Sequence, residues 1–123
     1  MDQWNGALQT CDVLEPGAEQ TYYDEFERNV RDLIQQGRVR PLRSEALAAV
    51  LHFDQVDMVF LDDDHAYEHV RDEIRAYRQV VRPGGILCGH DYMENHPGVM
   101  QAVDEAFGCG VQRAGFSIWW VRL

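Results

Sequence analysis

The spacing of apolar residues in the first third of the chain predicts a helix and then a short strand. Over residues 22–36, apolar side chains recur every three or four positions, as on one face of a helix, and Gly37 ends the pattern. The apolar residues among 39–42 predict a short strand, which Pro41 restricts to a sheet edge or a strand end. The preceding residues, 1–20, are polar, contain a Pro-Gly pair and are expected to form a loop.

Three further helices are predicted downstream. The first runs from Ser44, a residue type that caps helix N-termini, through EALAAVLHF. Its inner face is expected to carry Leu47, Val50 and Leu51. The second is amphipathic, is broken by the RPGG sequence at 82–85, and has an apolar face of Tyr67, Val70, Ile74, Tyr77 and Val81. The third begins near Pro97, a residue suited to a first helical turn, and ends at Gly108.

The short apolar run VDMVFL at residues 56–61 is followed at once by three carboxylates and a histidine. An apolar run of this length predicts a strand buried on both faces. Asp62, Asp63, Asp64 and His65 would then lie at its carboxyl end, before a helix, where open α/β sheets bind their ligands. We therefore expect the functional site here.

Another predicted strand, residues 86–88, ends in the polar sequence Gly-His-Asp-Tyr. Consecutive parallel strands lie side by side, so their ends would bring Asp62, His90 and Asp91 together. An oxygen-rich cluster of this kind suits Mg²⁺ or Mn²⁺ better than zinc. His65 is suited to act as a general base, because an unperturbed imidazole has a pKa of about 6.5. The alternative is that these acids are solvated loop residues, with Asp64 capping the next helix.

A competing motif overlaps this segment. Residues 65–69, His-Ala-Tyr-Glu-His, fit the H-x-x-E-H pattern of inverted zinc peptidases. Such a site would require His65 and His69 on one helical face together with a distant third ligand. His65 is expected at the strand end, before the helix begins, which argues against that arrangement.

The order of predicted elements defines the fold class. After the third strand-helix unit, VQRAGFSIWWVRL divides at Ala114-Gly115 into two short strands of an antiparallel hairpin. Strands that alternate with helices and end in a β-ribbon predict an α/β fold with a mostly parallel sheet. At 123 residues the chain is expected to form one domain, residues 1–123.

Composition excludes several classes of function. The formal charge of −10 argues against a nucleic-acid partner, which requires a basic face. All basic side chains except histidine are arginine, so lysine chemistry such as a Schiff base or a P-loop is excluded. Cys11, Cys88 and Cys109 lack the spacing of a zinc site or a disulfide framework, and Cys88 is expected in the core. Without an apolar run long enough for a membrane span and without a signal peptide, a cytoplasmic location is expected.

The run DMVFLDDDHAYEHVRDEIRAYRQVVRPGGILCGHDY resembles the second half of a class I S-adenosylmethionine-dependent methyltransferase, closest to the macrocin and catechol O-methyltransferase-like group. That group has a strand ending in D-G-D-H-x-Y, an amphipathic helix, P-G-G, a strand and H-D-Y. This chain has D-D-D-H-A-Y at 62–67, P-G-G at 83–85 and H-D-Y at 90–92. PGVMQAVDEAF and SIWWV are similar to the last helix and closing ribbon of the family.

The resemblance implies a Rossmann-like methyltransferase fold and a set of site residues. Asp62 and Asp91, with His90 beside them, would hold a divalent ion such as Mg²⁺, and His65 would deprotonate a hydroxyl acceptor. Asp2 and Trp4 are similar to the motif that binds the ribose of S-adenosylmethionine, and Ser44 to the segment that approaches the adenine. Asp62 is also expected to contact that cofactor.

The chain departs from the family in its first part and at Asp63, which replaces the usual glycine. No G-x-G occurs near the start, and the Gly-Cys-Gly at 108–110 follows a helix rather than a strand. The expected fold is therefore truncated, lacking the N-terminal strand and Gly-rich loop. That truncation would leave the strand at 56–61 as a sheet edge, so we expect a homodimer or a domain-swapped assembly to cover it.

Two functions follow from these patterns. The first is a metal-assisted O-methyltransferase that acts on a small hydroxylated acceptor. The second is a non-catalytic methyltransferase-like module with a structural or interaction role.

Overall fold

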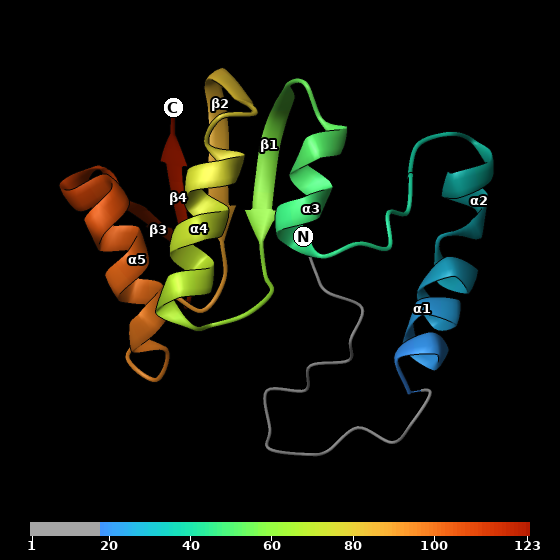
Figure 1. Cartoon of the computed structure of the whole chain (residues 1–123), viewed down its shortest axis with the longest axis horizontal. Helices are drawn as coiled ribbons and strands as arrows, with labels where there is room; N and C mark the ends of the chain where they lie inside the picture. The colour runs from blue at the N-terminus through green and yellow to red at the C-terminus, as the bar shows by residue number, and fades with distance from the viewer. Residues whose placement is uncertain (1–17) are drawn as a thin grey trace. The chain divides into compact units, whose positions relative to one another are not determined.

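The computed structural model describes residues 18–123, which belong to two compact units (Figure 1). The described part of the first unit is residues 18–45, and the second contains residues 46–123. Each is described separately below. The organisation of residues 1–123 as a single domain stays a prediction.

The first unit contains two helices, α1 (Ala18–Asn29) and α2 (Arg31–Gln35). They replace the single helix expected over 22–36, because Val30 forms a turn between them. The strand expected at 39–42 is absent from the described residues: that segment is irregular. Gly37 adopts a left-handed φ of 70°, and the amides of Arg38 and Val39 then donate to the Leu33 carbonyl. The start of the expected strand is thus used to close the helix end.

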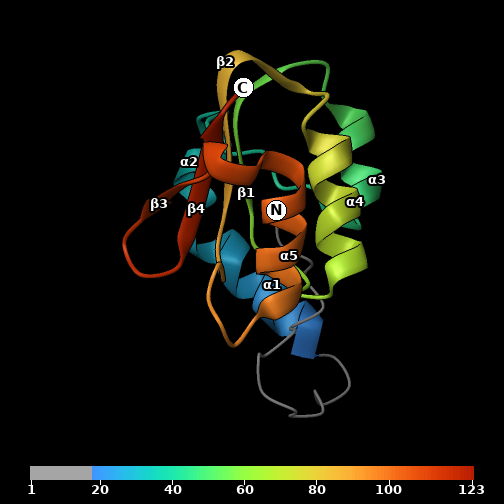
Figure 2. The same ribbon diagram turned by 90° about the vertical axis from the view of Figure 1, so that its left-hand side faces the viewer.

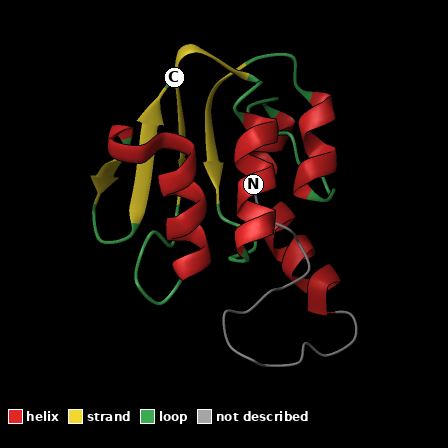
Figure 3. Ribbon diagram, turned by 60° about the vertical axis from the view of Figure 1, so that its left-hand side comes forward, coloured by secondary structure: helices red, strands yellow, loops and turns green. Residues whose placement is uncertain are grey.

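The second unit is built on a four-stranded sheet (Figure 3). Its strands are β1 (Val56–Leu61), β2 (Val81–Gly89), β3 (Gln112–Ala114) and β4 (Ile118–Arg122), in the order β1-β2-β4-β3. β1 and β2 are parallel, whereas β4 is antiparallel to both β2 and β3. The α/β class and the C-terminal ribbon are confirmed. The sheet is not mostly parallel, because the ribbon supplies two of the three pairings.

Two helices cover one face of this sheet, α4 (Tyr67–Tyr77) and α5 (Pro97–Phe107) (Figure 2). Pro97 occupies the first turn of α5, as predicted. Helix α3 (Ala46–Ala49) continues into the 3₁₀ turn η1 (Val50–His52), and a second turn, η2 (Gly108–Gly110), follows α5. None of the helices in the described part of the chain has the length and apolar character needed to cross a membrane.

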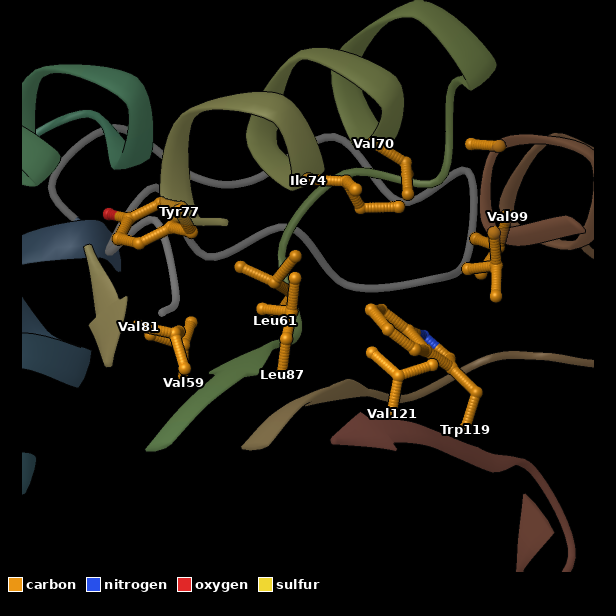
Figure 4. Close-up of a cluster of buried hydrophobic side chains, with 12 residues drawn as sticks. Val59, Leu61, Val70, Ile74, Tyr77, Val81, Leu87, Val99, Trp119 and Val121 are labelled. Atoms are coloured by element: carbon orange, nitrogen blue, oxygen red, sulfur yellow. The ribbon is translucent and has the colours of Figure 1, made fainter. Parts of the chain in front are cut away.

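The core lies between the sheet and these helices (Figure 4). Val59, Leu61, Leu87 and Trp119 point from the strands toward the side chains of α4 and α5. Burying each such side chain contributes about 1.5–3 kcal/mol. Cys88 is also buried, as predicted, and its thiol donates to the Val59 carbonyl at 3.2 Å.

The predicted apolar face of α3 is wrong at Leu47 and Leu51, although Val50 packs against the core as predicted. The face of α4 is confirmed except that Val81 lies outside the helix. On α3 the buried residues are Ala46 and Ala49, whereas Leu47 and Leu51 are 38% and 85% exposed. The Tyr77 hydroxyl donates to the Ala46 carbonyl at 2.6 Å, and this contact turns the small side chains inward. Val81 opens β2 rather than ending α4, which stops at Tyr77.

Candidate functional site

The paired ends of β1 and β2 position the predicted site. Leu61 is in register with Gly89, and the His90 amide donates to the Leu61 carbonyl at 3.1 Å. A Cβ atom on Gly89 would lie 2.6 Å from that same carbonyl oxygen and 2.8 Å from Trp119 Nε1. Only glycine therefore permits this close pairing, which places Asp62 next to the His90-Asp91 pair.

Asp62, His90 and Asp91 form one cluster, as the sequence predicted. Each offers a ligand atom, and these three atoms lie within 4.8 Å of one another. His90 Nδ1 is 3.0 Å from Asp91 Oδ1 and 4.0 Å from Asp62 Oδ1. His90 Nε2 is engaged by the Ser117 hydroxyl at 2.8 Å, while Nδ1 is buried without a hydrogen-bond partner. A free lone pair on Nδ1 between two carboxylates fits a divalent cation.

Asp91 joins this cluster to His65. Its Oδ1 faces His90, and its Oδ2 is hydrogen-bonded to His65 Nε2 at 2.6 Å. Asp91 is 3% exposed and has a left-handed φ of 61°, a strained conformation for a residue other than glycine. Burial raises its carboxyl pKa, but the hydrogen bond from His65 and the charge of His90 outweigh this and lower the pKa overall. An ionised Asp91 accepts a hydrogen bond from the protonated Nε2 of His65, which leaves Nδ1 of His65 as the basic nitrogen.

His65 is held from the side of α5 as well. His96 stacks on its ring with centroids 4.3 Å apart, and His96 Nε2 lies 3.8 Å from Asp91 Oδ1. Sequence reasoning missed His96, because the loop before α5 carries no strand-end signal. Its only signal is its position directly before Pro97, which fixes where that helix starts.

Asp64 is exposed, as the alternative reading of the acids expected, but it does not cap α4. Its Oδ1 accepts a hydrogen bond from the Ala66 amide at 2.7 Å, just before α4 begins. The bond forms a local turn rather than a cap on the helix itself. Asp64 is exposed and belongs to no cluster of possible metal ligands among the described residues.

A second cluster joins the loop after β1 to α4. It consists of Asp63, His69 and Glu73, whose ligand atoms also lie within 4.8 Å of one another. His65 and His69 therefore belong to different clusters, and the zinc-peptidase arrangement of His65-x-x-x-His69 does not form. The reason is that His65 lies before α4 and pairs with Asp91, whereas His69 faces Asp63 and Glu73.

Burial changes the charge state of this second cluster. Desolvation and the nearby charge of Asp63 raise the pKa of Glu73 to about 7. Desolvation lowers the pKa of His69, but the negative charges of Glu73 and Asp63 outweigh it and raise that pKa overall. Sequence reasoning missed Glu73. Its spacing to Val70 and Tyr77 places it on the buried face of α4, and that was the available signal.

The two clusters share a narrow pocket. Its volume is about 10 Å³, close to the space that one water molecule or ion needs. Its polar lining comes from both clusters and from two further residues, Asp64 and His65; the cluster residues are Asp62, Asp63, Glu73, His90 and Asp91. Leu61, Val70 and Trp119 are among its apolar lining residues.

The other predicted site residues are not tested by this pocket. Asp2 and Trp4 lie outside the described residues. Ser44 belongs to the first unit, where its hydroxyl donates to the Glu45 carbonyl at 3.2 Å. The predicted capping role of Ser44 is thus replaced by a bond to its neighbour. The roles of all three residues in cofactor binding stay predictions.

Comparisons with known proteins give a consistent result. A family model described as a methyltransferase domain matches residues 2–92. One similar solved structure is the apo form of CalS11, a TDP-rhamnose 3'-O-methyltransferase of calicheamicin biosynthesis. It superposes with a TM-score of 0.64 at 15% identity, over 98% of this chain and 56% of that chain, so the likeness concerns the fold. The present chain thus spans little more than half the length of this neighbour. No curated protein matches the sequence.

Proposed function

From the premise that this chain belongs to the class I S-adenosylmethionine-dependent methyltransferase family, we propose that it takes part in metal-assisted methyl transfer to a hydroxyl group. The acceptor we propose is a small hydroxylated molecule. The observation that carries the proposal is the position of Asp91 between two functional groups. Its Oδ1 faces the possible ion site, and its Oδ2 is hydrogen-bonded to the basic histidine His65.

Asp62, His90 and Asp91 would hold the divalent ion. A bound Mg²⁺ or Mn²⁺ would supply Lewis acidity, which lowers the pKa of a hydroxyl group placed beside it. The nitrogen donor of His90 favours Mn²⁺ over Mg²⁺, because imidazole is a softer ligand than a carboxylate. Asp91 has two roles in this scheme. One of its carboxylate oxygens would coordinate the ion, and the other would orient His65.

His65 would remove the acceptor proton. Asp91 fixes its ring, and the stacked His96 restricts rotation, so Nδ1 is presented in one orientation. S-adenosylmethionine, when bound, would supply the electrophilic methyl group for the deprotonated oxygen. By family resemblance, Asp2, Trp4, Ser44 and Asp62 are the proposed contacts to that cofactor.

Calorimetric titration with S-adenosylmethionine, with and without Mn²⁺, tests the proposal. We expect binding that is at least tenfold tighter with Mn²⁺ and that is lost in Asp62→Ala. Glu94→Ala provides the control, because Glu94 is an exposed carboxylate in the loop between β2 and α5. Equal effects of the two substitutions would contradict the proposed role of Asp62.

The second candidate is a non-catalytic module that retains the family fold. The observation in its favour is Asp63, which stands between Asp62 and Asp64 where the family pattern has a glycine. The same titration separates the two functions. Absence of any heat at millimolar cofactor, in a folded protein, would support the module and exclude the enzyme.

A further inference from the structure

We propose that Asp63, His69 and Glu73 form a second divalent-cation site, distinct from the cluster of Asp62, His90 and Asp91. The chemical class that it would take is a borderline cation such as Zn²⁺. The inference does not depend on methyl transfer, because it concerns side chains that the function proposed above does not use.

The three side chains converge from two elements. Asp63 lies in the loop after β1, while His69 and Glu73 lie one turn apart on α4 and so share a helical face. The side chains of Asp63 and Glu73 are only 4% and 1% exposed, whereas that of His69 is 24% exposed. The carboxylates are therefore withdrawn from water, and the imidazole leaves a route by which an ion can enter.

The hydrogen bonds within the cluster leave one buried oxygen without a partner. His69 Nε2 lies 3.1 Å from Asp63 Oδ2 and 3.5 Å from Glu73 Oε1. One imidazole nitrogen carries at most one proton, and the shorter contact is the hydrogen bond. Glu73 Oε1 is consequently buried without a hydrogen-bond partner. An unpaired buried carboxylate oxygen is costly, and a cation at this point would satisfy it.

The spacing of the ligand atoms fits tetrahedral zinc. Bonds of about 2.0–2.1 Å at tetrahedral angles place neighbouring ligand atoms roughly 3.3 Å apart. The two distances from His69 Nε2, 3.1 and 3.5 Å, lie on either side of that value. One imidazole and two carboxylates are ligands that zinc accepts, and the two carboxylate charges balance those of the ion.

An ion at this site would tie the loop of residues 62–65 to α4. Asp63 is flanked by Asp62, so the same ion would limit the movement of the first proposed site without contributing a group to it. An ion that binds the folded chain alone stabilises it by RT ln(1 + L/Kd), where L is the free ion concentration. We therefore expect the melting temperature to rise on addition of Zn²⁺.

Titration of the metal-free full chain with Zn²⁺ tests the inference, with Co²⁺ as a spectroscopic probe of geometry. Because the first cluster can also bind a cation, the decisive comparison is made in the Asp62→Ala background. We expect that variant to keep one Zn²⁺ and the intense visible absorption of tetrahedral Co²⁺. Adding His69→Ala should weaken Zn²⁺ binding more than tenfold and abolish the absorption.

Two controls complete the design. Glu68→Gln, on the exposed face of α4, should leave Zn²⁺ affinity unchanged. His69 is the least buried of the three ligands, so His69→Ala is expected to fold, and far-ultraviolet circular dichroism checks this. In the Asp62→Ala background, unchanged Zn²⁺ affinity and unchanged Co²⁺ absorption after His69→Ala, or no Zn²⁺ binding before it, would overturn the inference. If the chain binds this Zn²⁺ but does not bind S-adenosylmethionine, the result would contradict the proposed function and leave the present inference intact.

Discussion

At the scale of single residues, the ionisation of Glu73 depends on where α4 places it. The side chain is buried beside Asp63, and both burial and that charge favour the neutral acid. In the unfolded chain the same carboxyl would ionise near its ordinary pKa of 4.5. The folded protein therefore binds more protons than the unfolded chain between these two values.

This difference predicts a stability that depends on pH when no metal is present. In the presence of a chelator, the free energy of unfolding should fall as the pH rises from about 4.5 to about 7, by on the order of 3 kcal/mol. The raised pKa of His69 acts in the same direction, since its stabilising charge is lost at higher pH. Urea unfolding at several pH values measures this.

Glu73→Gln should flatten the pH profile, because glutamine has no proton to lose in this range. Glu68→Gln serves as the matched control and should retain the full slope. An unchanged slope in Glu73→Gln would show that Glu73 ionises normally.

Whether a site residue can be predicted from the sequence depends on the structural element that positions it. Asp62, His90 and Asp91 follow two strands, and the pairing of parallel strands brings their ends together whatever the details of packing. Glu73 and His96 are different, because they are placed by the packing of a helix and by a loop conformation. The spacing of Glu73 to Val70 and Tyr77 indicated the buried face of α4, but a glutamate is usually exposed on a helix, so this signal was overridden.

At the scale of elements, β1, β2 and β4 are held together around Gly89. β1 pairs with β2 at this residue, and Trp119 of β4 lies directly opposite. The strand end that supports His90 and Asp91 therefore has no room for a side chain at position 89.

Gly89→Ala should consequently destabilise the protein by about 1–3 kcal/mol, the usual range for an overpacked core. A backbone carbonyl and the buried indole of Trp119 would both have to move to accept the methyl group. Gly110→Ala is the control, because an added Cβ there meets no atom within 4 Å. Thermal unfolding measures both, and similar losses of stability in the two variants would contradict the argument.

The elements that the sequence predicted well are those with a continuous apolar pattern. β1, α4, α5 and the final ribbon all carry such a pattern, and the structure confirms them. The predicted elements are wrong where local hydrogen bonds override the apolar pattern. Val30 breaks the first helix, residues 38 and 39 close the end of α2, and the hydroxyl of Tyr77 reorients α3.

At the scale of the whole molecule, β1 forms one edge of the sheet. Among the strands that the structure describes, it pairs with β2 alone. Met58 in this strand is 58% exposed, and an apolar edge strand is a template for pairing with another chain. We therefore propose, as the sequence suggested, that a second copy of the chain covers this edge.

Light scattering on a size-exclusion column should give the mass of a homodimer at micromolar concentration. Met58→Lys should convert it to a monomer, because a charge on an edge strand opposes strand pairing. Phe116→Lys provides the matched control: Phe116 is 83% exposed but lies in the turn between β3 and β4. A monomeric wild-type protein would refute the proposal.

The start of α5 also determines how much freedom the site has. A Cβ on Gly98 would lie 2.6 Å from the His65 carbonyl oxygen and 2.8 Å from the Tyr67 amide nitrogen, so only a hydrogen atom fits there. The two backbones are thus in direct contact, and the His65 ring is stacked against His96 a few atoms away. The position of His65 is consequently coupled to that of the start of α5. Any adjustment of His65 toward a bound molecule would also shift the start of α5, which favours an acceptor that fits the existing orientation over one that requires the histidine to swing.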